Sequence, residues 1–493
     1  MDVTSDDSGL SLDPSVRSFR QGTVLVGGHP GRLMVLSRAG ADALQAWLEG
    51  GRPTEATRQL GRRLVVAGMA HPEDPEAVGS GRGAGVELPH VTVVVPARDR
   101  SASLDRCLGS LGPEVRVIVV DDGSERPDIL ADVCTRHGAT LIHRVVNGGA
   151  AAARNEALSS VSTELVAFVD SDCEVTEGWL AGLVWMFADT ELAAVAPRIR
   201  PRSPGAAAAR SALSRYSGHR SALDMGPDRS EVGPGRAVGY VPTAALVARR
   251  SALDSGFDER LRVGEDVDLV WRLLEAGWRV RYEPSVTVSH DEPTSWAGLL
   301  LRRFRYGTSA APLSRRHPGR LAPLELRPWP TAVATAVLAR RPALAATLLA
   351  GSTLALTRQV RRFGVPVAST LRWSSEGAAW TAVGMGHALT ELWGPLLVVS
   401  ALRSRRGAVT VAVLVAVPPL VEWWRRRPPL DPVRWSVAAV ADDVAYGAGV
   451  WWGCIRDRTL GPLLPRLRLR SDGGIPPSVA NTGVAPPPSA DGV

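Results

Sequence analysis

Four short acidic motifs in a fixed order constrain the fold of this chain more than any other feature. They are VVVPARDR at 93–100, VVDDGS at 119–124, VDSD at 169–172 and GEDVDL at 264–269. Each of the first three closes an apolar, β-branched run, which is typical of strands buried in a parallel sheet. Because the carboxyl ends of such strands meet at one edge, the sequence predicts an α/β fold with one acidic crevice. The acids expected around it are Asp99, Asp121, Asp122, Asp170 and Asp172.

Several carboxylates at one edge repel each other unless a cation or hydrogen-bond donors lie among them. Hard divalent cations such as Mg²⁺ and Mn²⁺ prefer carboxylate oxygens. A single DxD triplet usually lies in a solvated turn. Its place after the third strand, behind VVDDGS, favours a metal-binding active site instead.

The motifs over residues 90–310 resemble those of the GT-A glycosyltransferases of family 2, which use nucleotide-diphospho-sugars. The resemblance implies a Rossmann-like nucleotide-sugar-binding domain and a Mn²⁺ or Mg²⁺ cofactor. Asp170-Ser171-Asp172 matches the DxD element of that family. The match implies that Asp170 faces the ribose and the metal, while Asp172 ligates the metal directly. A cation there would stabilise the charge that grows on the departing diphosphate.

The same resemblance implies the donor pocket. Asp122 matches the position that reads the uracil base, Pro96 and Arg98 wall the same pocket, and Asp99 lies beside them. For Asp121 we expect a structural role, in which it orders the turn of VVDDGS.

Arg154 is a further candidate for donor binding. It lies in NGGAAAARN at 147–155, which matches the family motif NxGxxxARN at the start of a helix. Glycines allow close backbone approach, and a helix N-terminus with an arginine suits a diphosphate. The alternative is an ordinary loop and helix cap.

The GEDVDL motif supplies the candidate base. In the family an acid here accepts the proton of the attacking hydroxyl, so the reaction inverts the anomeric carbon. The match puts this role on Asp266, with Glu265 as neighbour or reserve. The alternative is helix capping, because acids in a first turn favour the helix dipole. Asp268 and Arg272 lie four residues apart and are expected to form an ion pair.

VTVSH at 286–290 predicts a strand that ends in a histidine. The resemblance implies that His290 is the last metal ligand, and neutral imidazole is a suitable Mn²⁺ ligand. The alternative is a polar strand end. The segment between Pro197 and Gly239, which has little periodicity, is expected to form the acceptor side.

RRFRYG at 302–307 lies where processive polysaccharide synthases carry QxxRW. The absence of that motif counts against a synthase that extrudes its product. Arg302, Arg305 and Tyr306 are candidates for binding acceptor or pyrophosphate. A basic contact with anionic lipid is the alternative, and the sequence does not separate the two.

The chain has 493 residues, enough for two or three domains. Its net charge of +7 comes with 57 basic residues, all arginine. No nucleic-acid motif accompanies them, so we expect no nucleic-acid partner. Arginines cluster at 302–320, 358–362, 403–406 and 425–427, beside apolar stretches. Such flanks indicate the cytoplasmic face of the cell membrane, and a peripheral cytoplasmic enzyme is the alternative.

Residues 311–462 are expected to form an apolar helical, membrane-associated region. Its apolar stretches at 378–402 and 408–424 are candidates for two membrane spans, with amphipathic helices at the interface. The alternative is a soluble helical domain that packs on the catalytic domain. We expect disorder at 1–15 and 463–493, and a linker at 76–89.

Residues 16–75 are expected to form a small α+β module. A hairpin turns at 27–31, and helices follow at 37–48 and 54–66. This order resembles the PqqD-like domains of ribosomal-peptide biosynthesis. Such domains bind a leader peptide as an added strand at a sheet edge.

The module and the acidic motifs together resemble the glycosyltransferases of mycofactocin systems. The quoted motifs carry this resemblance, together with VLVGGHPGRLMVLSRAG at 24–40. It implies β-1,4-linked glucose, taken from UDP-glucose and added to the peptide-derived redox cofactor pre-mycofactocin. The alternative is a family 2 enzyme that acts on a lipid or cell-wall acceptor at the membrane.

Overall fold

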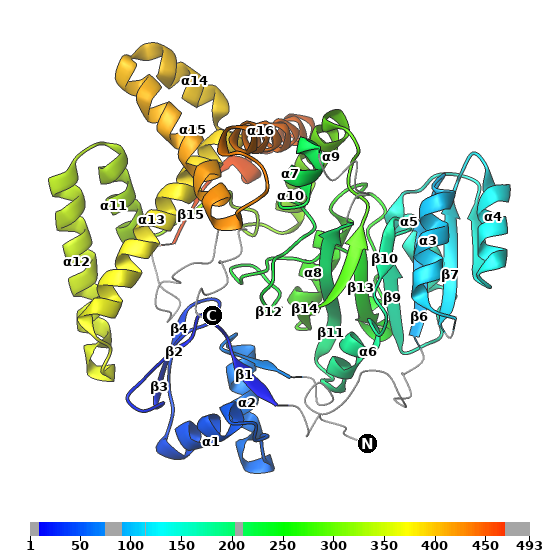
Figure 1. Ribbon diagram of the computed structural model, residues 1–493, viewed down its shortest axis with the longest axis horizontal. Helices are drawn as coiled ribbons and strands as arrows, with labels where there is room; N and C mark the ends of the chain where they lie inside the picture. Colours follow the sequence, from blue (N-terminus) through cyan, green and yellow to red (C-terminus); the bar gives the residue numbers. More distant parts are fainter. Residues whose placement is uncertain (1–8, 74–90, 114, 203–210, 469–493) are drawn as a thin grey trace. The chain divides into compact units, whose positions relative to one another are not determined.

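The computed structural model describes residues 9–73, 91–113, 115–202 and 211–468 (Figure 1). The chain divides into two compact units. The sheet unit comprises residues 73–234 and 238–293, and the helical unit comprises residues 9–72, 235–237 and 294 onward. The predicted linker at 76–89 lies outside the described residues. So do residues 1–8 and 469–493 of the two segments expected to be disordered.

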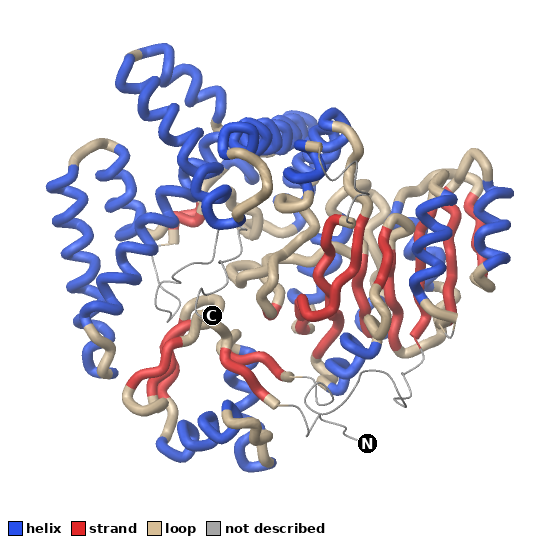
Figure 2. Tube along the Cα trace, viewed as in Figure 1, coloured by secondary structure: helices blue, strands red, loops and turns tan. Residues whose placement is uncertain are grey.

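A mixed sheet with the order β10-β14-β11-β13-β9-β6-β7-β8, in which β12 also pairs with β14, forms the sheet unit (Figures 1 and 2). Its strands are β6 (Val91–Ala97), β7 (Arg116–Asp122), β8 (Thr140–Arg144), β9 (Leu165–Val169), β10 (Cys173–Val175), β11 (Leu192–Pro201), β12 (Ser230–Glu231), β13 (Ala245–Arg249) and β14 (Arg279–His290). Its helices are α3 (Ser101–Leu111), α4 (Pro127–Arg136), α5 (Ala150–Leu158), α6 (Ala181–Val184), η1 (Trp185–Ala188), α7 (Ala212–Ser217), η3 (Arg250–Leu253) and α8 (Glu265–Glu275).

The valine-rich runs form the buried centre of this sheet, as the sequence predicts. Val93, Val94 and Val95 of β6 are fully buried, so both faces of the strand are covered. β6 pairs in parallel with β7 and with β9, and β7 pairs in parallel with β8. The three acidic motifs that follow β6, β7 and β9 therefore meet at one edge.

The antiparallel strands bring His290 to the same edge. β13 runs antiparallel to β9, β11 runs antiparallel to β13, and β14 runs parallel to β11. β14 therefore has the direction of β9, and its last residue lies at the carboxyl edge. β10 returns antiparallel to β14 with Cys173 opposite His290. This pairing places Asp172, one residue earlier, beside the histidine.

The helical unit joins the N-terminal module to the C-terminal helices. The module contains β1 (Leu10–Leu12), β2 (Arg17–Phe19), β3 (Val24–Gly27), β4 (Arg32–Val35), α1 (Arg38–Leu48), α2 (Glu55–Val66) and β5 (Ala70–Pro72). The remaining elements are α9 (Trp296–Thr308), α10 (Ala310–Arg316), β15 (Glu325–Leu326), α11 (Pro328–Leu338), α12 (Pro342–Val360), η4 (Arg361–Phe363), α13 (Val367–Leu392), α14 (Gly394–Arg403), α15 (Arg405–Arg426), α16 (Pro432–Arg456), η5 (Gly461–Leu463) and β16 (Arg466–Leu467).

The predicted hairpin and both predicted helices of the module are present within a residue of their expected bounds. The expected disorder of residues 1–15 is wrong for its last part, because β1 pairs with β5. Likewise β16, in the predicted disordered tail, pairs with β15. Short segments such as these gain order from partners that lie far away in the sequence.

The three-stranded sheet β2-β3-β4 is covered on both faces. Leu25 packs with α1 and α2 in the core of the module. Val24 and Val26, which point to the other face, pack with Val360 and Trp373 of the C-terminal helices. The module and these helices therefore share a hydrophobic core.

The predicted pair of membrane spans is only partly matched by the helices. The stretch 378–402 is divided, because α13 ends at Leu392 and α14 begins at Gly394. Among the described residues, one helix, α15, is long and apolar enough to cross a membrane, with 22 residues and a mean hydropathy of 1.6 in its best window. The core helix of a soluble protein can meet the same two criteria.

Candidate active site

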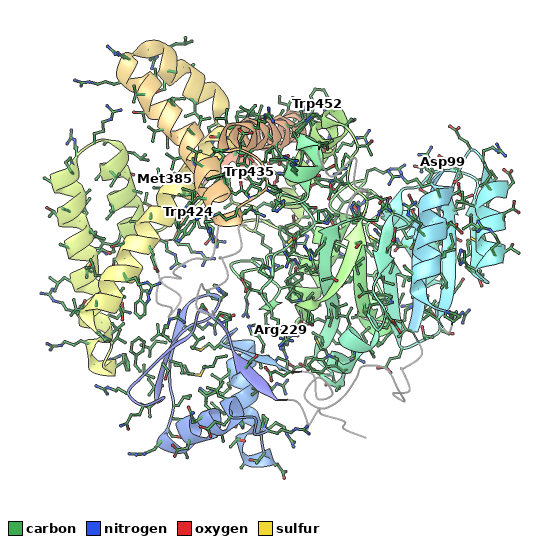
Figure 3. All side chains as sticks on the ribbon, viewed as in Figure 1. Asp99, Arg229, Met385, Trp424, Trp435 and Trp452 are labelled. Carbon is green, nitrogen blue, oxygen red and sulfur yellow. The ribbon has the colours of Figure 1, made fainter. Side chains whose placement is uncertain are left out.

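A hydrogen bond accepted by Asp99 ties the loop after β6 to the loop after β7, and Asp121 orders that second loop. Asp99, labelled in Figure 3, accepts a hydrogen bond from the backbone N–H of Glu125 at 2.7 Å. Asp121 is fully buried and accepts from the backbone N–H of Ser124 at 3.0 Å. His143 contacts the other oxygen of Asp121 at 2.8 Å. The predicted structural role of Asp121 is thus confirmed.

Asp122 has contacts that the sequence did not anticipate. Its carboxylate accepts hydrogen bonds from the backbone N–H groups of Gly148 and Gly149, at 2.8 and 2.7 Å. Asn147 and Arg144 donate to the same carboxylate, at 2.9 and 3.1 Å. Asp122 therefore orders the loop before α5, and that loop does not offer these two amides to a diphosphate. Whether Asp122 also reads the base stays a prediction.

The other predicted pocket residues lie at the end of β6. Pro96 pairs across the sheet with Val120 of β7. Arg98 is 52% exposed, and its Nε lies 3.4 Å from Oδ2 of Asp99. Both residues are thus available at the carboxyl edge, and their contacts with a donor stay predictions.

Arg154 links the two acidic motifs that matter most for chemistry. It donates to Asp170 at 2.7 Å and to Glu265 at 3.0 Å, and it is 2% exposed. Its guanidinium also lies 5.4 Å from the ring centre of Phe257. A side chain this buried holds the DxD and ED motifs together, so the expectation that Arg154 faces the diphosphate is not supported by its position.

Burial and neighbouring charges set the pKa values of this cluster. Burial opposes the charge of Arg154, but Asp170 and Glu265 raise its pKa, so it stays charged. Burial raises the pKa of Asp170, against the opposing effect of Arg154. Burial, and then the charge of Glu265, raise the pKa of Asp266 to about 7. Asp266 therefore has the pKa of a general base near neutral pH.

Contacts also distinguish Glu265 from Asp266. Glu265 is engaged by Arg154, whereas within the described residues Asp266 accepts a hydrogen bond from the backbone N–H of Val267 alone, at 2.8 Å. Gly264 begins this turn with a positive φ of 85°, which favours glycine. The geometry therefore favours Asp266 over Glu265 as the base. The predicted ion pair between Asp268 and Arg272 is present at 2.8 Å.

Asp172 and His290 form the candidate metal site. Nε2 of His290 lies 3.6 Å from Oδ1 of Asp172, and the backbone N–H of Asp291 donates to the carbonyl of Asp172 at 3.0 Å. Among the described residues, no three His, Cys, Asp or Glu side chains form a metal-binding group. One carboxylate and one imidazole nonetheless fit Mn²⁺ or Mg²⁺ in an open site, whose remaining positions diphosphate oxygens and water would fill. Asp170, on the same loop, is held by Arg154.

Two sets of arginine contacts at this site were missed by the sequence analysis. Arg100 of VVVPARDR forms an ion pair with Asp172, as a cation at that carboxylate would. Arg106 of α3 bridges Glu174 at 2.9 Å and Asp291 at 2.8 Å. The position of Arg100 just after β6 could have indicated the first contact. The second joins residues 185 apart in sequence, which no local pattern reveals.

The RRFRYG run lies in α9, which belongs to the helical unit. Within that unit Arg303 forms an ion pair with Asp442 of α16 at 2.6 Å. A Cβ at Gly307 would come within 2.1 Å of the carbonyl oxygen of Tyr446, so glycine lets α9 approach α16 closely. These contacts give the run a packing role. The acceptor or pyrophosphate roles of Arg302, Arg305 and Tyr306 stay predictions.

The chain is similar in sequence to known glycosyltransferases. A family model described as Glycosyl transferase family 2 matches residues 92–255. The pre-mycofactocin glycosyltransferase of Mycobacterium tuberculosis is 37% identical over 481 residues, which cover 94% of this chain and 98% of that protein. The poly-beta-1,6-N-acetyl-D-glucosamine synthase of Staphylococcus epidermidis is 26% identical over 200 residues, 39% of this chain and 47% of that protein.

Among solved structures, a mannosyltransferase from Pyrobaculum calidifontis, in complex with GDP-Man and Mn²⁺, matches 69% of this chain and 98% of its own. The sequence identity is 21% and the TM-score is 0.37.

Proposed function

This chain belongs to the glycosyltransferases of family 2, and we propose that it transfers glucose from UDP-glucose to pre-mycofactocin with inversion of the anomeric carbon. The observation that carries this proposal is the Arg154 bridge from Asp170 to Glu265. It fixes the DxD motif beside Asp266, whose raised pKa of about 7 suits a base. The name of the Mycobacterium tuberculosis relative supports the acceptor.

Each residue of the site has a distinct task in this reaction. A bound Mn²⁺ or Mg²⁺, held by Asp172 and His290, would supply positive charge for the departing diphosphate. Asp266 accepts the proton of the attacking acceptor hydroxyl, on the face opposite the leaving group. Arg154 holds the carboxylates of Asp170 and Glu265 close together and remains charged while it does so. A displacement in one step gives a β-glucoside from the α-linked donor.

The test is transfer with defined partners. The full-length protein is incubated with Mn²⁺, pre-mycofactocin and UDP-glucose, or with UDP-galactose or GDP-mannose in its place, and products are analysed by mass spectrometry. We expect addition of hexose units from UDP-glucose and loss of transfer in EDTA. Linkage analysis of the product tests the β-1,4 assignment. Full activity in EDTA contradicts the metal assignment, and transfer only to a lipid or cell-wall acceptor contradicts the peptide-derived one.

We infer that the N-terminal module recognises the peptide-derived acceptor. The support is its three-stranded sheet, whose two faces are covered, so that β2 and β4 remain as edges where a peptide can add as a strand. Deleting the whole module would expose Val360 and Trp373 of the shared core. A point substitution at an edge is therefore the cleaner test.

Val35 on edge strand β4 is 55% exposed and provides that test. Val35→Lys should raise the acceptor KM while hydrolysis of UDP-glucose stays unchanged, because remote contacts hold the acceptor in place. Leu48→Lys, at the end of α1 and 45% exposed, is the matched control. An unchanged acceptor KM in Val35→Lys removes the support for peptide recognition at this edge.

We also infer that the helical unit binds the cytoplasmic face of the cell membrane. Support comes from α15, which carries an exposed stripe at i+3 and i+4 spacing, with arginines at both helix ends. The stripe consists of Val409, Val413, Val417, Leu420 and Trp424. The 22 residues of α15 span about 33 Å at 1.5 Å per residue, which is comparable to the thickness of the hydrocarbon layer of a membrane.

Flotation with liposomes tests the membrane proposal. We expect the full-length protein to float with vesicles that contain anionic lipid. A Val413→Asp substitution within the stripe should reduce flotation. Recovery of the wild type in the unbound fraction at all lipid compositions contradicts membrane binding and leaves a soluble helical unit as the better account.

A further inference from the structure

Among the residues that the structure describes, none is a hydrogen-bond partner for one buried ring nitrogen of His290. The side chain is 8% exposed, and Nδ1 makes no hydrogen bond. The other ring nitrogen, Nε2, faces Asp172 at 3.6 Å. A buried polar nitrogen without a partner costs free energy. The unpaired Nδ1 therefore indicates a hydrogen bond that forms when the site is assembled.

Glu292 is the carboxylate that faces this nitrogen. Its Oε1 lies 4.0 Å from Nδ1, and its side chain is 9% exposed. A movement of about 1 Å brings this pair to hydrogen-bond distance. Histidines that bind metals commonly donate their second N–H to a carboxylate, which fixes the tautomer and the ring orientation. We propose that Glu292 is the positioning residue that receives the Nδ1–H of His290 and so presents the Nε2 lone pair to the metal.

The same carboxylate is bonded to the predicted acceptor-side segment. The hydroxyl of Ser221 donates to Oε1 of Glu292 at 2.7 Å. Nearby, the hydroxyl of Tyr282 donates to the carbonyl of Gly226 at 2.7 Å, which holds the segment to β14. One oxygen of Glu292 thus faces both Ser221 and His290. A movement of this segment on acceptor binding is thereby coupled to the orientation of the metal ligand.

This inference rests on the proposed metal-dependent function, and direct metal binding tests it. Mn²⁺ is titrated into the full-length protein with UDP present, and free Mn²⁺ is followed by electron paramagnetic resonance. Glu292→Ala should weaken Mn²⁺ binding about 10- to 100-fold. Glu292→Gln, which keeps an acceptor oxygen, should restore part of the affinity. Ser221→Ala should weaken binding less than Glu292→Ala does.

Asp105 provides the matched control. It contacts His137 at 2.8 Å in the same unit, so Asp105→Ala also removes a carboxylate from a histidine. Its Mn²⁺ affinity should equal that of the wild type. If the wild type binds no Mn²⁺ with UDP, the proposed metal dependence fails. If the wild type binds Mn²⁺ and a folded Glu292→Ala protein binds it equally well, the role of Glu292 fails while the proposed function stands.

Discussion

Buried acids that pair with arginines occur in both units of this protein, as Asp268 does with Arg272 in the sheet unit, but half-buried Asp266 is held differently. In the helical unit, Asp442 and Glu422 are each 3% exposed and lie against an arginine, Arg303 at 2.6 Å and Arg426 at 2.9 Å. In the sheet unit, burial and then the charge of the neighbouring acid Glu265 raise the pKa of Asp266 to about 7. A buried acid with a close arginine serves packing. Asp266, with its raised pKa, can instead accept a proton near neutral pH.

Exposed apolar side chains are distributed the other way, mostly in the helical unit. Of the large hydrophobic side chains exposed in the described residues, only Val145, Val146 and Tyr240 lie in the sheet unit. All the others lie in the helical unit, many of them along α15 and α16. The sheet unit therefore has little exposed apolar surface, and its unfavourable features are the acids of the candidate site. The helical unit exposes apolar side chains on its surface, where a partner such as a membrane can cover them.

The largest expected effect is at the metal site. Asp172→Ala removes the one carboxylate that faces both His290 and Arg100, so turnover should fall about 10³-fold or more. Mn²⁺ binding measured with UDP should be lost as well, while circular dichroism stays unchanged. Asp128→Ala, an exposed carboxylate on α4, is the control. Wild-type turnover in Asp172→Ala would contradict the metal assignment.

The next effect distinguishes the two acids of the ED motif. Asp266→Asn keeps the shape of the base but removes its function, so kcat should fall roughly 10²–10⁴-fold with little change in donor affinity. Glu265→Gln weakens the Arg154 bridge, so it should affect donor or metal binding as well as kcat. Steady-state kinetics separate the two patterns. If Glu265→Gln alone abolishes kcat, the base has been assigned one residue too late.

A stability measurement tests the other half of the comparison. Asp442→Ala leaves Arg303 in a buried site without this carboxylate, which should lower the free energy of unfolding by roughly 3 kcal/mol. Glu376→Ala, from the largely exposed pair with Arg372, should cost less than about 1 kcal/mol. Urea unfolding followed by tryptophan fluorescence measures both. Loss of transfer without loss of stability in Asp442→Ala would give this acid a functional role.

The last expected effect is a pH dependence of stability with a defined sign. The folded state raises the pKa of Asp266 from 3.8 to about 7, so the folded protein holds this proton more tightly than the unfolded chain. Stability from this group therefore falls as pH rises from about 4 to about 7 and is constant above. Asp266→Asn should raise Tm over the wild type by more at pH 8 than at pH 5. An equal difference at both values would contradict the raised pKa.

The edge of the sheet could be predicted from the sequence because it depends on local patterns. Valine runs followed by acids place Asp99, Asp122 and Asp170 at the ends of parallel strands, and this arrangement is present. His290 lies at the same edge because β9 pairs with β13, β13 with β11 and β11 with β14. Its position at the end of a strand was nevertheless visible in VTVSH. Local patterns of this kind locate strands and strand ends.

The orientation of individual side chains could not be predicted. Arg154 follows an alanine run at a helix start, a pattern that does not say whether the arginine turns to the ligand or into the core. Its burial depends on Asp170 and Glu265, which lie 16 and 111 residues away in sequence. The shared core of the module with Trp373 likewise joins distant segments. Tertiary contacts of this kind leave no local signal.

The anomeric configuration of the product tests the central claim most directly. A single displacement assisted by Asp266 must convert the α-linked glucose of UDP-glucose into a β-glucoside. The glucosylated product of the wild-type enzyme is examined by proton NMR, through the coupling of its anomeric proton. A β configuration is the predicted result. An α configuration would mean that the reaction retains configuration, and it would contradict the role of Asp266 as the base of a direct displacement.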